Sequence, residues 1–400
     1  MARAGTSPTR SGPEGSSRNE PRLGRCQPLT FSPLKEQGFR YAHDATGHRI
    51  LIPAGDSLAD LGWSSFFADQ CTPEEQQDAT PMRVISVHRS RVESLGANGP
   101  QTLFLRSIHA AGDIAVGDWV LAQSAAVLRV LERKSLVQRH AAGKGIGRQL
   151  IAANLDTVFI VTSCNADFNP ARLERYLALV SSAGVSPVIL LTKSDTSDDP
   201  ARYLREAETL SNDLTVLPLD ARAEDVADQL ARWCGPGRTV ALLGSSGVGK
   251  STLANALTGG HLATQGIRED DAKGRHTTTA RHLLAMTGGG WVIDTPGMRE
   301  LRLTDAGDGI DAVFEDLTTL ATQCKFRNCA HDGEPGCAIE AAQAAGQIDP
   351  ERRRRWAKLL AEDSYSTETL AEARARQRGF SKKVRSAVSA KPAKRGPSGR

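Results

Sequence analysis

The sequence predicts a multidomain chain with an N-terminal β-barrel, a central α/β domain built on a parallel sheet, and a C-terminal α-helical domain that binds zinc. Three features predict it: short β-like runs in the first third, strands alternating with amphipathic helices in the middle, and a cysteine cluster near the end. The length of 400 residues agrees, because one compact core seldom organises so long a chain. No apolar run approaches the ~20 residues of a membrane helix, so we expect no membrane partner.

The N-terminal region divides into an extension and a packing segment. Residues 1–30 are rich in Gly, Pro, Ser and Arg and are expected to be disordered. They lack the apolar stretch of a signal peptide, whereas an Arg- and Ser-rich transit peptide stays open as an alternative. Residues 31–80 are expected to form a short segment that packs on the barrel, with a helix around Leu58–Phe67.

Residues 81–145 have the pattern of a small β-barrel. Gly and Asp separate four short apolar runs, which favours strands joined by turns. The runs are Met82–Val87, Thr102–Leu105, Asp118–Leu121 and Ala126–Leu131. Regular short strands over so few residues favour an OB-fold, and another small β-barrel is the alternative on pattern alone.

Residues 150–305 alternate strands with helices. Three nearly continuous apolar runs predict strands that are buried on both faces: Asp156–Thr162, Val188–Leu191 and Thr239–Leu243. Asn169 and Pro170 are expected to begin the helix after the first strand, as the N-cap and the first-turn residue. Sheets of this kind bind ligands at the carboxyl ends of their strands.

One of these strand ends carries a phosphate-binding loop. The loop and the start of the following helix are Gly244, Ser245, Ser246, Gly247, Val248, Gly249, Lys250, Ser251 and Thr252. Its spacing is that of a P-loop, whose backbone N–H groups surround the phosphates. Lys250 is then expected to act on the β- and γ-phosphates in catalysis, and Ser251 to supply an oxygen to Mg²⁺. The loop alone does not distinguish ATP from GTP.

A second strand end indicates guanine. Its residues are Thr192, Lys193, Ser194 and Asp195. The Asp195 carboxylate can accept hydrogen bonds from N1–H and the 2-amino group of guanine, and adenine has no such pair of donors. The stem of Lys193 can lie along the base. Thr192 offers one hydrogen-bonding group fewer than the Asn often found there, so we expect modest guanine affinity.

The order of the two motifs is the most specific feature of the sequence. In an ordinary GTPase the phosphate loop precedes the guanine-binding motif. Here Thr192–Asp195 precedes Gly244–Ser251. The sequence therefore predicts a circularly permuted P-loop GTPase domain.

Two further segments are expected to sense the γ-phosphate. Asp294 is expected to reach Mg²⁺ through water, and the Gly297 N–H to contact the γ-phosphate. Met298 follows and cannot orient the attacking water. His276 is the catalytic candidate for that task, with an exposed loop histidine as the alternative. Thr279 is favoured over its two neighbouring threonines to complete the Mg²⁺ shell.

A metal site is expected in the last third of the chain. Its ligands are Cys324, Cys329, His331 and Cys337. Three thiolates and one imidazole complete the tetrahedral shell of one structural Zn²⁺ ion and leave no open position. Buried free cysteines beside an incidental histidine are the alternative. The odd total of seven cysteines fits a reducing cytoplasm better than a disulfide framework.

The C-terminal region is basic, although the whole chain carries a net charge of only +4. Residues 306–372 are expected to form the zinc-binding domain. Its helix at Asp349–Trp356 is either a solvated face or an RNA contact. Residues 373–400 contain no acid and are expected to form a basic disordered tail, which is either solvated or bound to phosphate backbones.

These parts in this order resemble the RsgA (YjeQ) family of circularly permuted bacterial GTPases. The resemblance runs from Leu61–Trp63 to the basic C-terminal helix and includes Leu150–Asp156 and Gly274–Thr279. It implies an OB-fold, a GTPase domain and a zinc domain. It also implies late maturation of the small (30S) ribosomal subunit, with activity stimulated by that subunit. The chain departs from the family at Asp220–Ala221, where the loop that supports the base often reads Ser-Ala.

We therefore expect a cytoplasmic, monomeric GTPase that converts GTP and water to GDP and phosphate, binds rRNA of the small subunit, and leaves on hydrolysis. Zn²⁺ and Mg²⁺ are the expected cofactors. One alternative is a GTP-switched RNA-binding protein whose hydrolysis is incidental. Another is an ATP-dependent P-loop protein, against which Asp195 speaks. The motif order also leads to the hypothesis that the switch at 294–297 connects to the zinc domain, so that the GTP state moves that domain.

Overall fold

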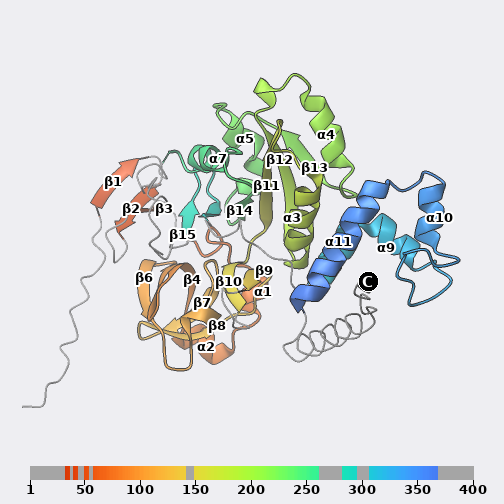
Figure 1. Cartoon of the computed structure of the whole chain (residues 1–400). Helices are drawn as coiled ribbons and strands as arrows, with labels where there is room; N and C mark the ends of the chain where they lie inside the picture. The colour runs from red at the N-terminus through yellow and green to blue at the C-terminus, as the bar shows by residue number, and fades with distance from the viewer. Residues whose placement is uncertain are drawn as a thin grey trace, which may run out of the picture.

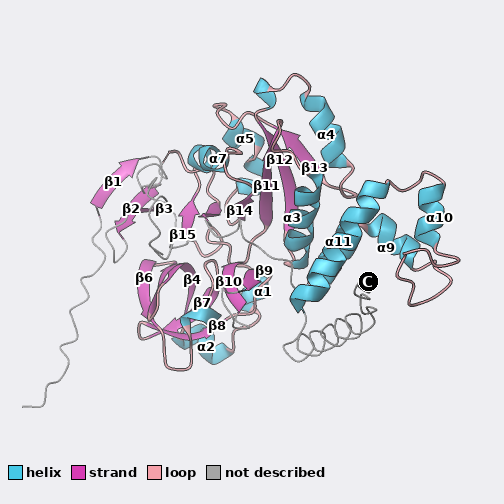
Figure 2. Cartoon of the chain, in the orientation of Figure 1, coloured by secondary structure: helices cyan, strands magenta, loops and turns pink. Residues whose placement is uncertain are grey.

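The computed structural model describes residues 32–36, 39–43, 49–53, 57–140, 148–260, 282–294 and 306–367. A β-barrel lies below a sheet with helices on its faces, and the C-terminal helices lie to one side of the sheet (Figure 1). The strands all lie in the first two described parts of the chain, together with helices, and the last described part is helical (Figure 2). The expected extension at 1–30 and tail at 373–400 lie outside the described residues.

Five strands close the barrel in the order β4-β5-β6-β8-β7, which is the strand order of an OB-fold. They are β4 (Thr80–Val87), β5 (Arg91–Gly96), β6 (Gly99–Phe104), β7 (Trp119–Gln123) and β8 (Ala126–Val130), with a short 3₁₀ helix η1 (Ala111–Asp113) before β7. The predicted barrel is confirmed. Strand β5 is absent from the prediction because Glu93 and Ser94 interrupt its apolar pattern, yet both are buried. Thr102 Oγ1 donates to the Glu93 carboxylate at 2.7 Å, which satisfies one of its buried oxygens.

Three strands and two short helices precede the barrel. The strands β1 (Ser32–Glu36), β2 (Phe39–His43) and β3 (Arg49–Pro53) form an antiparallel sheet that the sequence pattern did not predict. The helix expected near Leu58–Phe67 is only the four-residue α1 (Ser65–Ala68), and α2 (Pro73–Asp78) follows it. In α1, the buried Phe67 ring packs 5.8 Å from Trp119 of the barrel. In α2, Glu75 accepts a 2.6 Å hydrogen bond from Arg129 of β8.

Two contacts join the barrel to the sheet. The hairpin of β9 (Leu136–His140) and β10 (Arg148–Ala153) connects them along the chain. Gly117, just before β7, lies so close to the end of this hairpin that a Cβ on Gly117 would lie 2.2 Å from the Ala153 carbonyl oxygen. In addition, the fully buried Arg83 of β4 donates a 2.6 Å hydrogen bond to Thr239 Oγ1 at the first residue of the sheet strand β14. The barrel is therefore packed directly against the start of the strand that leads to the phosphate loop.

The central sheet has the order β13-β12-β11-β14-β16-β15, and only the edge strand β15 is antiparallel to its neighbour. Its strands are β11 (Thr157–Ser163), β12 (Ser186–Thr192), β13 (Thr215–Pro218), β14 (Thr239–Leu243), β15 (His282–Ala285) and β16 (Trp291–Asp294). The helices are α3 (Pro170–Ser182), α4 (Pro200–Glu208), α5 (Val226–Gln229), α6 (Ala231–Cys234) and α7 (Lys250–Leu257). As predicted, the Asn169 side chain caps α3 by accepting from the Arg172 N–H at 3.1 Å.

The strand order explains where a ligand binds. The chain builds β11, β12 and β13 outward on one side, then returns to add β14 on the other side of β11. The direction of winding thus reverses between β11 and β14. Open α/β sheets bind ligands at such a switch point, beyond the carboxyl ends of the strands. The guanine-binding motif follows β12 and the phosphate loop follows β14, so both lie at this edge.

The C-terminal helices are α8 (Gly307–Val313), α9 (Glu315–Ala321), α10 (Ala338–Ala344) and α11 (Pro350–Thr367). Helix α8 approaches α3 so closely that a Cβ on Gly309 would lie 2.0 Å from the Ala178 carbonyl oxygen. This part of the chain is therefore docked on the central domain. No helix among the described residues is long and apolar enough to cross a membrane.

Candidate nucleotide site and metal centre

The phosphate loop starts in contact with the neighbouring strand. A Cβ on Gly244 would lie 2.1 Å from the Val161 carbonyl oxygen of β11, so only glycine fits there. Gly249, at φ +96°, is the N-cap of α7. Lys250 Nζ donates to the Ser245 carbonyl across the loop. Ser246, Gly247, Ser251 and Thr252 remain exposed, so this loop is open to a ligand.

The guanine-binding motif contacts the phosphate loop through its first residue. Thr192 is 1% exposed, and its Oγ1 lies 2.6 Å from the Val248 carbonyl oxygen and 3.0 Å from that of Thr162. Lys193 adopts a left-handed backbone conformation, which turns the chain into the 3₁₀ helix η2 (Ser194–Thr196) and leaves Asp195 exposed. The Thr192 hydroxyl thus connects the base-reading segment to the loop that holds the phosphates. The sequence argument treated Thr192 as a weaker Asn and missed this connection.

The side chain of Asp220, which stands where the family often has Ser, has a hydrogen-bond partner within its own loop. The Asp220 carboxylate accepts the Arg222 N–H at 2.9 Å and so closes its own turn. Ala221 is buried, and a Cβ on Gly249 would lie 3.8 Å from its methyl group. This loop therefore lies at the same edge of the sheet as both motifs.

The thiol of Cys164 also lies at this edge of the sheet. Its N–H donates to the Thr192 carbonyl at 2.9 Å, directly behind the guanine-binding motif. Burial raises the pKa of the Cys164 thiol, and the nearby charge of Asp195 raises it further. Cys164 is therefore a neutral packing group at physiological pH.

The switch residues are only partly described. Asp294 ends β16, which pairs with β14 in parallel register, so its backbone reaches the edge where the phosphate loop begins. His276, Thr279 and Gly297 lie outside the described residues. Their assignments to water positioning, the Mg²⁺ shell and the γ-phosphate remain predictions.

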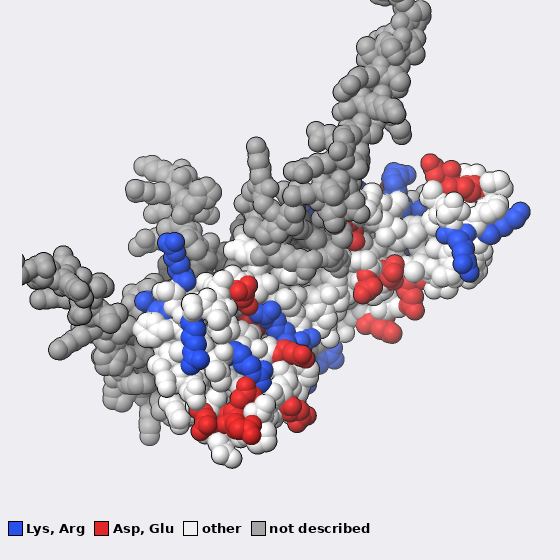
Figure 3. All heavy atoms as spheres, turned by 90° about the horizontal axis from the view of Figure 1, so that it is seen from below, with Lys and Arg blue, Asp and Glu red and all other residues white. Residues whose placement is uncertain are grey.

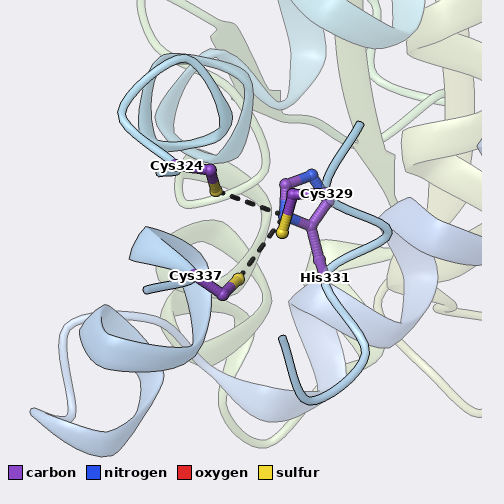
Figure 4. Close-up of side chains that lie close together, drawn as sticks. All are labelled: Cys324, Cys329, His331 and Cys337. Carbon is purple, nitrogen blue, oxygen red and sulfur yellow. Dashed lines mark hydrogen bonds between the residues drawn. The ribbon is translucent and has the colours of Figure 1, made fainter. Parts of the chain in front are cut away.

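Three cysteines and one histidine converge beside the C-terminal helices (Figure 4). The ligand atoms of Cys324, Cys329, His331 and Cys337 all lie within 4.8 Å of one another. His331 Nδ1 lies 3.5 Å from the sulfurs of both Cys324 and Cys337. In a tetrahedral shell with zinc-type bond lengths, two ligand atoms are about 3.5–3.8 Å apart. The donor set and its spacing therefore fit one metal ion.

Neighbouring groups fix the loop that carries these ligands. The Glu334 carboxylate accepts the N–H groups of Ala330 and Asp332, at 2.9 and 2.7 Å. Arg353 of α11 donates to the His331 carbonyl. The Trp356 ring packs 5.5 Å from the His331 ring. Such contacts hold the imidazole in position for a metal ion.

The arginines of α11 have a role that the sequence analysis did not foresee. It left two interpretations of this helix, a solvated face or an RNA contact. Instead, Arg352 and Arg355 both bind the buried Glu174 of α3, and Arg353 binds the metal loop. Only Arg354 points away, with 72% of its side chain exposed. Most of the positively charged side chains at the start of this helix therefore pair with groups of the protein itself.

Comparisons with known proteins agree with this geometry. A family model described as RsgA GTPase matches residues 130–304. The chain is 56% identical over 325 residues to the small ribosomal subunit biogenesis GTPase RsgA of Mesorhizobium japonicum, covering 79% of this chain and 93% of that protein. It is 45% identical over 343 residues to the small ribosomal subunit biogenesis GTPase RsgA 2 of Vibrio parahaemolyticus, covering 85% and 95%.

Solved structures give the same result. YjeQ from Thermotoga maritima matches with a TM-score of 0.54 and 26% identity, covering 71% of this chain and 98% of that one. YloQ, a circularly permuted GTPase, matches with a TM-score of 0.53 and 22% identity, covering 73% and 97%, and so shares the fold.

Proposed function

The chain belongs to the RsgA GTPase family, and from this premise we propose that it hydrolyses GTP during late maturation of the small ribosomal subunit. It binds the subunit through rRNA, is stimulated by it, and leaves once GTP is hydrolysed. The relatives named above carry the description small ribosomal subunit biogenesis GTPase. The proposed nucleotide binding rests on one observation: the Thr192 hydroxyl of the guanine-binding motif lies 2.6 Å from the Val248 carbonyl oxygen of the phosphate loop.

In the proposed site, different motif residues bind the base and the phosphates of the nucleotide. Asp195 accepts from guanine, and the backbone N–H groups of Gly244–Ser251 surround the phosphates. Lys250 offsets the negative charge on the β- and γ-phosphates while the γ-phosphoryl group is transferred to water and the β-phosphate leaves. Ser251 and Thr279 would bind Mg²⁺ directly and Asp294 would reach it through water, and the ion would neutralise phosphate charge. Catalysis then consists of positioning and charge stabilisation.

His276 is proposed to orient the attacking water, because Met298 cannot. Its substitution by Ala should abolish turnover while GTP binding persists, since the group acts on water and not on the nucleotide. An assay of phosphate release measures turnover, and a separate nucleotide titration measures GTP binding. Normal turnover in His276→Ala would remove the residue from the mechanism.

The barrel offers a surface for rRNA. OB-folds bind oligonucleotides with their second and third strands and the loops after the first and fourth. Phe104, 50% exposed at the end of β6, lies between those two loops: its N–H donates to Ala125, and the next residue donates to Ser90. Arg89 and Arg106 are exposed beside it. In Figure 3 basic side chains lie along the left of the barrel, the side of β6 in Figure 1, whereas acidic ones gather toward its bottom and right.

An exposed aromatic ring between cationic side chains suits an unpaired base and its phosphates. Phe104→Ala should therefore weaken subunit binding without changing intrinsic GTP turnover.

The metal in the Cys/His cluster is proposed to be Zn²⁺, and its role structural. Three thiolates favour a soft ion, and a Cys₃His set leaves no ligand position open for substrate. The cluster also lies in the C-terminal part, apart from the motifs of the nucleotide site. Metal content measured on the purified protein, with Cys329→Ser as the comparison, identifies the ion.

The decisive experiment compares GTP turnover with and without purified small ribosomal subunits. A large stimulation that large subunits do not reproduce is expected. GTP turnover that small subunits leave unchanged would contradict the assembly role and favour an RNA-binding protein with incidental hydrolysis. Lys250→Ala serves as the inactive control.

A further inference from the structure

Arg352 of α11 has every N–H group of its guanidinium hydrogen-bonded. Its Nε and one Nη2 hydrogen reach the Asp316 carboxylate of α9 at 2.9 Å each. The other Nη2 hydrogen reaches the Val313 carbonyl at the end of α8, at 3.0 Å. Nη1 reaches Glu174 of α3 at 3.2 Å and the Leu210 carbonyl just beyond α4 at 3.1 Å. A guanidinium has five N–H donors, and all five are satisfied here.

Glu174 receives a second arginine. Arg355 Nε and Nη2 approach its two carboxylate oxygens at 2.6 and 3.0 Å. The Glu174 side chain is fully buried, so both of its oxygens depend on these partners. Burial raises the pKa of Glu174, and the hydrogen bond from Arg355 opposes that shift.

Arg352 contacts α3 and the chain just beyond α4, and these two helices lie on either side of the guanine-binding motif along the chain. Helix α3 begins at the carboxyl end of β11 and leads into β12, the strand that ends in Thr192. Helix α4 follows the same motif directly, after residues 193–199. The ring of Phe168, just before α3, lies 5.2 Å from the ring of Tyr203 in the first turn of α4. One side chain of the C-terminal helix thus ties down the elements on both sides of the base-reading loop.

We propose that Arg352, with Glu174, is a positioning residue for guanine recognition. It acts through α3 and α4, which hold the loop of Lys193–Asp195, and it touches no nucleotide itself. This inference rests on the proposed guanine site and deepens it, because it places part of base selectivity in the C-terminal helix. Lys cannot replace Arg352, since an ammonium group has three donors and no planar fork.

The test compares GDP with IDP, whose hypoxanthine lacks the 2-amino group that Asp195 is proposed to bind. A hydrogen bond to a charged group contributes about 10- to 100-fold in affinity, and a displaced loop loses part of it. We therefore expect Arg352→Lys and Glu174→Gln to lower the GDP-to-IDP affinity ratio about threefold or more. A folding defect alone leaves this ratio unchanged, because unfolded protein binds neither nucleotide.

Arg354→Lys is the matched control, because Arg354 lies on the same helix but is exposed and pairs with Glu351 of that helix, at 3.0 Å. Its ratio should equal that of the unmodified protein. An unchanged ratio in both Arg352→Lys and Glu174→Gln would overturn the inference and leave the guanine site intact. An unmodified protein that does not distinguish GDP from IDP would overturn the proposed guanine site as well. Ribosomal subunits are absent from the assay, so the assembly role does not enter the result.

Discussion

Replacing Thr192 by Val removes one hydroxyl from the centre of the nucleotide site and keeps the shape of the side chain. In the unmodified protein this hydroxyl lies 2.6 Å from the Val248 carbonyl oxygen, inside the phosphate loop. Thr192 is 1% exposed, so water does not replace the lost donor. The Val248 carbonyl loses its link to the guanine reader, and the loop gains freedom to leave its binding conformation.

The expected cost follows from that burial. A buried acceptor left without its donor costs about 1–3 kcal/mol. If the phosphate loop takes up this cost on binding, GDP affinity falls roughly 5- to 150-fold. Titration with a fluorescent GDP analogue measures the affinity, and thermal unfolding without nucleotide measures the part of the cost that falls on folding.

Thr192→Ser is the control for the hydroxyl, because it keeps the donor and loses only a methyl group. Its GDP affinity should stay close to that of the unmodified protein. The reasoning fails if Thr192→Val binds GDP within twofold of the unmodified protein, or if Thr192→Ser is equally weakened. In either case the hydroxyl does not prepare the loop.

Four further outcomes are expected. Asp195→Asn should shift preference from GTP toward xanthosine triphosphate, and competition binding that shows unchanged GTP affinity would exclude Asp195 as the base reader. Gly309→Ala should lower the free energy of unfolding by about 1–3 kcal/mol, since its Cβ meets the α3 backbone, whereas Gly307→Ala, with no atom nearby, should not. Chelation should lower the midpoint of thermal unfolding by more than about 5 °C, and an unchanged midpoint would argue against a structural metal. The hydrogen bond from Arg129 lowers the pKa of Glu75 to about 2, so this pair stabilises the fold above the ordinary Glu pKa of 4.5 and the contribution disappears as pH falls toward 2; Glu75→Gln should lose that part of the acid dependence, measured by unfolding between pH 6 and pH 2.

The parts of the fold with a strong local signal were predictable. Strand β11 is buried at every position and its centre, Val158–Val161, is entirely apolar, and Asn169-Pro170 marks the start of α3 unmistakably. The phosphate loop was equally clear, because Gly244 is required by its close contact with the Val161 backbone, and Gly247 and Gly249 by their positive φ. These signals are local, and a single sequence contains them.

The parts that depend on distant partners were not predictable. Glu93 in β5 is tolerated only because Thr102 on the next strand bonds it. From the sequence, the arginines of α11 were predicted to face solvent or RNA. Their partner Glu174 lies far away in the sequence, and no residue near it indicates that it is buried. From the sequence, Thr192 was predicted only to bind guanine with modest affinity. Its contact with Val248 was not predictable, because that contact forms only when β12 and β14 lie beside β11. In each case the tertiary partner decided the role.

The position of β14 has a consequence for how this protein is made. Synthesis begins at the N-terminus, so β11, β12 and β13 leave the ribosome while β14 is still unmade. Until then β11 has one edge of its hydrogen-bonding groups unpaired, in the middle of the future sheet. The phosphate loop and the Thr192–Val248 contact come later still. A nascent chain of this protein therefore carries its base reader for a time without the loop that holds phosphates, and nucleotide can stabilise the sheet only after β14 has filled the central place.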